Sequence, residues 1–438
     1  MMKKQRAFLR IAAVVFVFVF ACCIVMAQLA PGGGSAALQL PQKSNGKAAL
    51  AVADTLNNRV LIYKAPIRTD ERASLVLGQP NFVQDSPNRG AGSPAANTLS
   101  APYGVAQGPD SEFFVADTAN CRVLEYVPPF SNGMNASVVI GEPDFETHNC
   151  FTLTTATASS LAAPVAVALD SHGDLWVVDS SLGDSRVLEY VPPFSNGMAA
   201  SLMIGQTTTG ASQGCNQVNG QPTRFGGAAI ASGLCVPRDL SFDSSGDLWI
   251  ADLANNRVLE FVPPFSTGMS ASLELGQPAG PDQFITQSPN QCLYTLPNCG
   301  PTAGKLFFPT ATAFDAGGNL WVADSGNNRV LEYEPPFSNG MNASLVLGQP
   351  DFTSGGTGVV TGYLDTPEGL AFQQSSGNLF VSDSNLNRVL MFEPPFTINM
   401  SPDAILGQRN LNGGLPNQGS PTPTAKTLYF PTGLAALQ

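Results

Sequence analysis

The sequence predicts an all-β fold built from six similar units, and the first observation behind this prediction is a repeat. A cassette recurs six times: an Asp, an Arg five residues later and a Gly nineteen residues after the Arg. Only the third copy differs, with two extra residues between its Asp and its Arg. Fixed-period self-similarity is the sequence signature of a repeat architecture. The six copies are Asp54/Arg59/Gly78, Asp117/Arg122/Gly141, Asp179/Arg186/Gly205, Asp252/Arg257/Gly276, Asp324/Arg329/Gly348 and Asp383/Arg388/Gly407.

The second observation is the strand pattern inside each unit, which is clearest around Asp324. Short apolar runs with β-favouring residues alternate with clusters of turn-forming residues. Pro335 and Pro336 end one of these runs, because proline has no N–H group for a strand ladder. Four antiparallel strands, repeated six times, describe a β-propeller. In this unit we expect the strands at residues 309–315, 320–323, 330–333 and 343–347.

The third observation concerns the two ends of the chain. Residues 431–438 match residues 367–374 and stop where a hairpin turn is due, and the first unit begins with such a turn at residues 44–46. The C-terminus is therefore expected to supply the innermost strand of the blade that begins at the N-terminus. Closing the ring in this way removes the exposed sheet edges that promote aggregation. We predict a single six-bladed propeller over residues 44–438.

The core of the cassette reads Asp-x-x-Asn-x-Arg-Val-Leu in most copies, followed one residue later by Phe or Tyr. This motif resembles the NHL repeat, and the resemblance extends over residues 44–438. It implies a six-bladed propeller. It implies no single activity, since NHL propellers include RNA binders, protein-binding scaffolds, sensor domains and a lyase. The units here are longer than the common NHL repeat, with the extra residues in one loop per blade.

Composition excludes one of these functions. Only 12% of the residues are charged, against about 25% in average soluble domains. The formal net charge is −12, six of the arginines belong to the cassettes, and Lys and Arg do not cluster. Binding to a phosphate backbone requires clustered positive charge, so we expect no nucleic-acid partner.

The N-terminus has the pattern of an export signal. Lys3, Lys4, Arg6 and Arg10 precede an uncharged run at residues 11–27, which ends in Val25-Met26-Ala27 with small residues at the −3 and −1 positions. We predict a signal peptide at residues 1–27 and a flexible lead-in at residues 28–43. We therefore expect an exported protein that is secreted, periplasmic or on the cell surface, and we separately expect a monomer. An uncleaved membrane anchor is the alternative.

Six cysteines follow this segment, and an exported protein favours disulfides over metal thiolates. Cys121 replaces a cassette Asn, and Cys150 lies in the loop after the same blade. The other four lie as two local pairs in two inter-blade loops, and no spacing has the CxxC form of a zinc site. We predict the disulfides Cys121–Cys150, Cys215–Cys235 and Cys292–Cys299.

Two kinds of loop differ in their repetition. The loop between the third and fourth strands begins Pro-Pro-Phe at Pro128, Pro192, Pro263 and Pro335, which predicts a packing role with Phe and Met between blades. The inter-blade loops are expected to share almost nothing, and variable loops on a rigid scaffold often carry recognition. These loops cover residues 79–101, 142–163, 206–236, 277–308, 349–366 and 408–430.

The six cassette aspartates could form a ring of cation ligands, but a structural role is favoured. Asp and Arg flank a four-residue hairpin loop, which places them opposite each other as a charge pair. Asymmetry appears instead just after the proline that opens each inner strand. The side chains there are candidates for the channel mouth, although ordinary rim residues solvated at the strand ends are the favoured interpretation. The candidates are Tyr103, Arg238, Asp239, Thr310 and Glu368.

These features lead to two functional hypotheses. The first is a non-catalytic propeller, without a cofactor, that binds a protein, peptide or glycan through its variable-loop face. The second is a metal-dependent propeller hydrolase or lyase, with Ca²⁺ or another divalent cation in the channel. His148 and His172 are expected to be plain surface residues, and the GxSxG, HExxH and phosphate-loop motifs are absent from the sequence.

Overall fold

A computed structural model describes most of the chain after Lys47. The described residues are 48–150, 157–181, 184–206, 215, 229–280, 284–285, 300–357 and 362–437. The predicted signal peptide, the lead-in and the cysteine pair Cys292 and Cys299 lie outside these residues. In the described part of the chain, no helix is long and apolar enough to cross a membrane.

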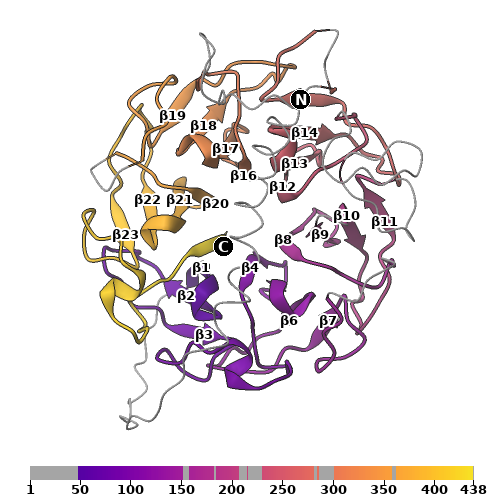
Figure 1. Cartoon of the computed structure of the whole chain (residues 1–438), viewed down its shortest axis with the longest axis vertical. Helices are drawn as coiled ribbons and strands as arrows, with labels where there is room; N and C mark the ends of the chain where they lie inside the picture. Colours follow the sequence, from indigo (N-terminus) through magenta and orange to yellow (C-terminus); the bar gives the residue numbers. More distant parts are fainter. Residues whose placement is uncertain are drawn as a thin grey trace, which may run out of the picture. The chain divides into compact units, whose positions relative to one another are not determined.

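Six four-stranded antiparallel sheets follow one another around a ring, which confirms the predicted six-bladed β-propeller (Figure 1). The innermost strands contact each other in sequence, and the ring is closed by a contact between β24 and β4. From the innermost strand outward, the first blade contains β24 (Pro431–Ala436), β1 (Ala48–Asp54), β2 (Arg59–Lys64) and β3 (Leu75–Leu77), and the second contains β4 (Pro102–Gln107), β5 (Phe113–Asp117), β6 (Arg122–Tyr126) and β7 (Val138–Ile140). The third blade contains β8 (Pro164–Leu169), β9 (Leu175–Ser180), β10 (Ser185–Tyr190) and β11 (Leu202–Ile204), and the fourth contains β12 (Pro237–Phe242), β13 (Leu248–Asp252), β14 (Arg257–Phe261) and β15 (Leu273–Leu275). The fifth blade contains β16 (Pro309–Phe314), β17 (Leu320–Asp324), β18 (Arg329–Tyr333) and β19 (Leu345–Leu347), and the sixth contains β20 (Pro367–Gln373), β21 (Asn378–Asp383), β22 (Arg388–Phe392) and β23 (Ala404–Leu406).

Ring closure occurs through the C-terminal strand, as predicted. β24 pairs antiparallel with β1 and places Leu434 opposite Val52. Figure 1 shows this yellow strand beside the indigo start of the propeller. The first blade is thus shared between the two ends of the described chain, and its innermost strand is supplied last.

Each cassette Asp lies opposite its Arg across the second and third strands of a blade. In the fifth blade, Asp324 is paired in register with Arg329, and the carboxylate Oδ2 lies 2.7 Å from Nε. Both side chains are fully buried, as they are in all six pairs. Each Arg is thus removed from water together with a charge partner, which makes these pairs structural rather than a ring of cation ligands.

The remaining donors of each cassette Arg hold the inter-blade loops. Arg329 donates through Nη1 to the carbonyl of Phe352 in the following loop, and through Nη2 to the carbonyls of Thr302 and Lys305 in the preceding loop. The other cassette arginines make similar contacts with loop carbonyls. One buried guanidinium therefore fixes the bases of two loops.

The cassette Gly is explained by a close approach to the loop that follows it. Gly348 has φ +83°, and a Cβ there would lie 2.5 Å from Cδ1 of Leu364. The same arrangement joins Gly78 to Leu99 and Gly141 to Leu161. Positive φ and lack of space both require glycine, which accounts for its fixed distance from the Arg.

The repeated loop between the third and fourth strands covers the outer strand of the preceding blade. In the second blade, Asn132 Oδ1 accepts the N–H of Val76, and Gly133 donates its N–H to the Val76 carbonyl, both at 3.0 Å. Phe130 and Met134 pack against the buried cluster between these blades. The loop protects the edge of an outer strand, in agreement with its predicted packing role.

The expectation that the inter-blade loops share almost nothing is wrong for one pair of loops. Residues 79–101 and 408–430 both contain a short 3₁₀ turn, Pro87–Gly90 and Pro416–Gly419, with two left-handed residues inside each turn. Asn88 bonds the side chain of Asn120, and Asn417 bonds that of Asn57 in the same manner. These two loops are therefore copies of one structure.

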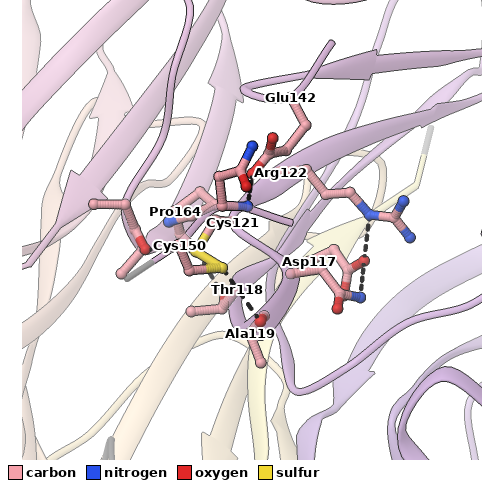
Figure 2. Close-up of a disulfide and its surroundings, with 12 residues drawn as sticks. Asp117, Thr118, Ala119, Cys121, Arg122, Glu142, Cys150 and Pro164 are labelled. Atoms are coloured by element: carbon pink, nitrogen blue, oxygen red, sulfur yellow. Dashed lines mark hydrogen bonds and ion pairs between the residues drawn. A yellow bond between two sulfur atoms is a disulfide. The ribbon is translucent and has the colours of Figure 1, made fainter. Parts of the chain in front are cut away.

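Two predicted disulfides, Cys121–Cys150 and Cys215–Cys235, are present in the structure. Figure 2 shows the first of them next to the ion pair of Asp117 and Arg122. Cys121 has φ 55° and occupies the left-handed position that Asn58, with φ 52°, takes in the first blade. The disulfide therefore ties down a loop at the place where Asn58, Asn328 and Asn387 of three other blades donate to a loop carbonyl.

Candidate functional site at the channel mouth

A β-bulge at the start of each inner strand directs one side chain toward the channel. In β12, Pro237 lies opposite Asp252 and Asp239 lies opposite Ala251, which leaves Arg238 between them without a partner. Register shifts at the same place include Thr310 in β16 and Glu368 in β20. Because a bulge changes the direction of the residue that it inserts, these residues come to line the channel cavity.

Side chains of the cassettes fix the backbone just before each bulge. Before the proline, Val236, Phe308, Thr366, Ala101 and Phe430 have left-handed φ values of 46–61°. Four of their N–H groups bond to a cassette Asn of the preceding blade, as in Thr366 to Asn328 Oδ1 at 3.0 Å. Each cassette Asp also accepts a backbone N–H just upstream of the proline. The repeated scaffold thus positions the residues that differ.

Tyr103, Arg238 and Glu368 converge from the inner strands β4, β12 and β20, which belong to alternate blades. We call these three residues the mouth triad. The Tyr103 hydroxyl donates to Glu368 Oε2 and accepts a 2.5 Å bond from Arg238 Nη2. Arg238 Nη2 lies 3.5 Å from Glu368 Oε2, and its guanidinium carbon lies 4.5 Å from the Tyr103 ring centroid. Three separated segments thus meet across the channel.

The triad is largely desolvated. The side chains of Arg238 and Glu368 are 11% and 9% exposed. Burial raises the pKa of Tyr103 well above its usual value, so this hydroxyl keeps its proton. Burial alone lowers the pKa of Arg238, but the neighbouring Tyr103 and Glu368 outweigh it and raise that pKa. Arg238 Nε is buried without an acceptor among the described residues.

Asp239 and Thr310 line the same channel, but they do not join the triad. Asp239 Oδ2 accepts the N–H of Thr312 at 2.9 Å, and burial raises the pKa of Asp239 to about 7. The Thr310 hydroxyl donates to the Pro367 carbonyl at 2.8 Å, which joins two adjacent blades. Thr310 therefore has its hydroxyl engaged in the ring, whereas the carboxyl of Asp239 is held by a backbone N–H.

The channel encloses a cavity of about 340 Å³ lined by all six inner strands. The mouth triad, Asp239 and Thr310 supply its polar groups at the starts of the strands. Apolar residues such as Val105, Val167, Leu240, Leu370 and Phe242 also line it. Gln107, Ser241, Thr312 and Gln374 add polar groups further along the inner strands, so the lining of the cavity is mixed.

A second cluster of possible metal ligands, Asp170, His172 and Asp174, has a structural explanation. Asp170 Oδ1 accepts the N–H groups of His172 and Asp174, and Oδ2 accepts Trp176 Nε1 at 3.2 Å. The corresponding Asp–Trp bonds recur as Asp243 to Trp249 and Asp315 to Trp321. This carboxylate caps a hairpin turn. His172 is 82% exposed and His148 is also exposed, as expected.

Sequence reasoning identified the triad residues one by one, but not their contact. It also did not anticipate the left-handed residue before each proline, although the Pro that opens each inner strand marks its place. The bulge itself gives no strong signal in a single sequence, because it depends on how two strands are aligned.

Comparison with known proteins supports the repeat assignment. The family model described as NHL repeat matches residues 234–261 and 308–333. A search of curated protein sequences finds no match.

Solved structures with a similar fold include a Bacteroides caccae protein described as of unknown function, with a TM-score of 0.47 and 10% identity, covering 89% of this chain and 99% of that chain. Another is a streptogramin B lyase, with a TM-score of 0.36 and 13% identity, covering 75% of this chain and 76% of that chain. A third is virginiamycin B lyase from Staphylococcus aureus, with a TM-score of 0.33 and 13% identity, covering 71% of this chain and 75% of that chain.

At such identities and scores these likenesses carry no functional argument. The chain thus contains NHL repeats in the two matched segments, and its six four-stranded blades closed through β24 form a six-bladed β-propeller.

Proposed function

We propose that this protein is a non-catalytic binding module whose loop face recognises a protein, peptide or glycan. The mouth triad anchors the ligand at the centre of that face. The observation that carries the proposal is the convergence of Tyr103, Arg238 and Glu368 from alternate blades into one network. A binding site on a symmetric scaffold requires such a departure from symmetry.

The polarity of the site supports binding rather than bond cleavage. Each polar group of the triad already interacts with another, and an Arg with donor groups left over suits recognition of a ligand acceptor. Nucleophilic catalysis needs a nucleophile beside a general base. At this mouth the hydroxyl of Tyr103 lies beside Glu368, but burial raises its pKa and keeps it protonated.

The alternative, a divalent cation that serves a hydrolase or lyase, has weaker support from this geometry. Glu368 faces Arg238 at 3.5 Å, and a cation bound to that carboxylate would be repelled by the guanidinium. Asp239 directs Oδ2 to the Thr312 N–H. Ca²⁺ prefers six to eight oxygen ligands, more than these two carboxylates supply.

The test is a ligand screen with the purified protein on peptide and glycan arrays, followed by calorimetry on the hits. Arg238→Gln is expected to weaken the hits about tenfold or more, the effect of losing a charge-assisted bond. His172→Ala is the matched control, because that exposed side chain touches no triad residue. Hits unaffected by Arg238→Gln would refute the anchoring role.

Metal analysis and a calcium-dependent thermal shift address the alternative. A stoichiometric divalent cation whose binding is lost in Asp239→Asn or Glu368→Gln would replace the binding proposal with the metal-dependent one. Metal content near zero and no thermal shift with Ca²⁺ are the results expected for the binding module.

A further inference from the structure

We propose that the ligand group held at the mouth is a carboxylate on a short chain, bound through Arg238 with the chain in the cavity. This inference rests on the proposed function and specifies the chemistry of the same site. Its first support is the guanidinium donor that the described part of the protein leaves without an acceptor.

Arg238 uses one side of its guanidinium within the triad. Nη2 donates to Tyr103 and faces Glu368, whereas Nε is buried and has no acceptor among the described residues. Structures rarely leave a buried donor unsatisfied without a reason. A carboxylate is the acceptor that best matches a guanidinium, because its two oxygens can take two parallel N–H bonds.

The contact between Tyr103 and Glu368 allows Arg238 to exchange Glu368 for a ligand carboxylate. Arg238 Nε has no exposed surface in this structure, so the side chain must turn to present it. Glu368 then keeps the hydrogen bond from the Tyr103 hydroxyl and is not left as an unpaired buried carboxylate. Tyr103 thereby allows Arg238 to move from a protein carboxylate to a ligand carboxylate.

The acidic groups that face this position repel an anion less strongly than their residue types suggest. The charged or titratable groups are Arg238, Glu368, Asp239 and the protonated Tyr103. Burial raises the pKa of Asp239 to about 7, so it carries only part of a negative charge at neutral pH. The negative charge opposing a ligand carboxylate therefore comes mainly from Glu368.

Size and lining specify the rest of the ligand. A cavity of about 340 Å³ is near the lower end of the roughly 300–1,000 Å³ found for ligand pockets. Beyond the mouth its lining combines apolar and polar side chains, namely Val105, Val167, Leu240, Leu370, Gln107, Ser241, Thr312 and Gln374. This volume fits a short chain or one terminal residue of a peptide, and it excludes a folded partner from the channel itself.

The test uses hexanoate as the probe, with hexanamide and acetate as its analogues, in calorimetric and NMR titrations of the full chain. We expect saturable binding of one hexanoate, with hexanamide about tenfold weaker or worse because it lacks the charge. Acetate should also be weaker, because it is too short to fill the cavity beyond the mouth. A peptide ending in Leu, free or amidated, shows whether a chain terminus is the natural source of the carboxylate.

Variants then assign the contact. Arg238→Gln should weaken hexanoate about tenfold or more, and Arg238→Lys should retain part of the binding because it keeps the charge. Glu368→Gln should bind hexanoate at least as well as the wild type, because it removes the opposing charge, and His172→Ala should bind unchanged. Thermal melting of each variant separates loss of binding from loss of fold.

Equal affinity for hexanoate and hexanamide, or unchanged binding in Arg238→Gln, would overturn the carboxylate inference. If hexanoate fails to bind while triad variants still lose a peptide or glycan hit, the carboxylate inference is wrong and the binding function stands. If no array hit depends on the triad but hexanoate binds through Arg238, the macromolecular ligand is wrong and the small-molecule site remains.

Discussion

The buried Asp–Arg pairs and the mouth triad use similar chemistry for different ends. Arg329 is fully buried, and each of its nitrogens donates to Asp324 or to a loop carbonyl. Arg238 also lies against a carboxylate, yet its Nε has no acceptor among the described residues and its side chain borders a cavity. Six copies of the first arrangement support the ring, whereas the second occurs once in the described part of the chain.

This difference indicates where the propeller can carry specificity. A residue that appears in every blade, such as the cassette Arg, interacts with backbone groups that every blade also has. Tyr103, Arg238 and Glu368 have no such counterparts, because the equivalent positions hold Val165, Thr310 and Thr432. The repeated residues stabilise the fold, and the unrepeated ones are free to recognise a ligand.

Removing the closing strand should have the largest effect, because both regions depend on the ring. Deletion of residues 431–438 removes β24 and the burial of Leu434 and Leu437, together about 3–6 kcal/mol. That is a large part of a typical domain's stability. We expect aggregation or a much lower Tm in calorimetry. Deletion of residues 28–43 is the control and should leave Tm nearly unchanged; equal melting of both deletions would contradict the closed ring.

The two arginines can be compared directly by replacing each with Met. Arg329→Met leaves Asp324 buried without its cation and should cost about 3–5 kcal/mol in chemical denaturation. Arg238→Met should cost clearly less, because Glu368 keeps its bond from Tyr103 and the triad borders a cavity. Equal losses would mean that the triad is one more structural pair.

Two glycines with the same backbone angle separate conformation from packing in the scaffold. Gly348 and Gly318 both have φ +83°, but only at Gly348 would an added Cβ meet a neighbour, at 2.5 Å from the Leu364 side chain. Gly318→Ala should cost about 1 kcal/mol from the left-handed conformation alone. Gly348→Ala should add about 1–3 kcal/mol of steric strain. Denaturant midpoints measure both, and a Gly348 variant as mild as the Gly318 variant would show that the repeated loop leucine can move.

The smallest expected effect concerns Asp239 and pH. The pKa of Asp239 is raised from 3.8 to about 7 in the folded protein. Between these two pH values the folded state therefore keeps a proton that the unfolded state has lost. Stability should therefore fall as pH rises from about 4 to about 7. Asp239→Asn should raise Tm relative to wild type at pH 8 and change it little at pH 4. Glu146→Gln, an exposed control with the same charge change, should show no such pH-dependent difference.

Much of the fold was predictable, for reasons visible in particular residues. The strands are short and end at prolines and turn formers, and Pro431 onward repeats the sequence of an inner strand, so both the blade count and the closure follow. The similarity of the loops at residues 79–101 and 408–430 was missed, because their shared Pro-Asn and Thr-Leu positions are separated by dissimilar residues. Cys121 was correctly paired with Cys150, since both belong to one blade and its loop.

Local sequence determined the repeated features of this protein, because each depends on residues close in the chain: Asp324 faces Arg329 across one hairpin, and Gly348 meets Leu364 in the next loop. Only the tertiary structure decided the site. Tyr103 and Glu368 are 265 positions apart and touch because six blades close around one axis. The contact also depends on a bulge in each inner strand, and the alignment of two strands, not the residue inside the bulge, sets where that side chain points.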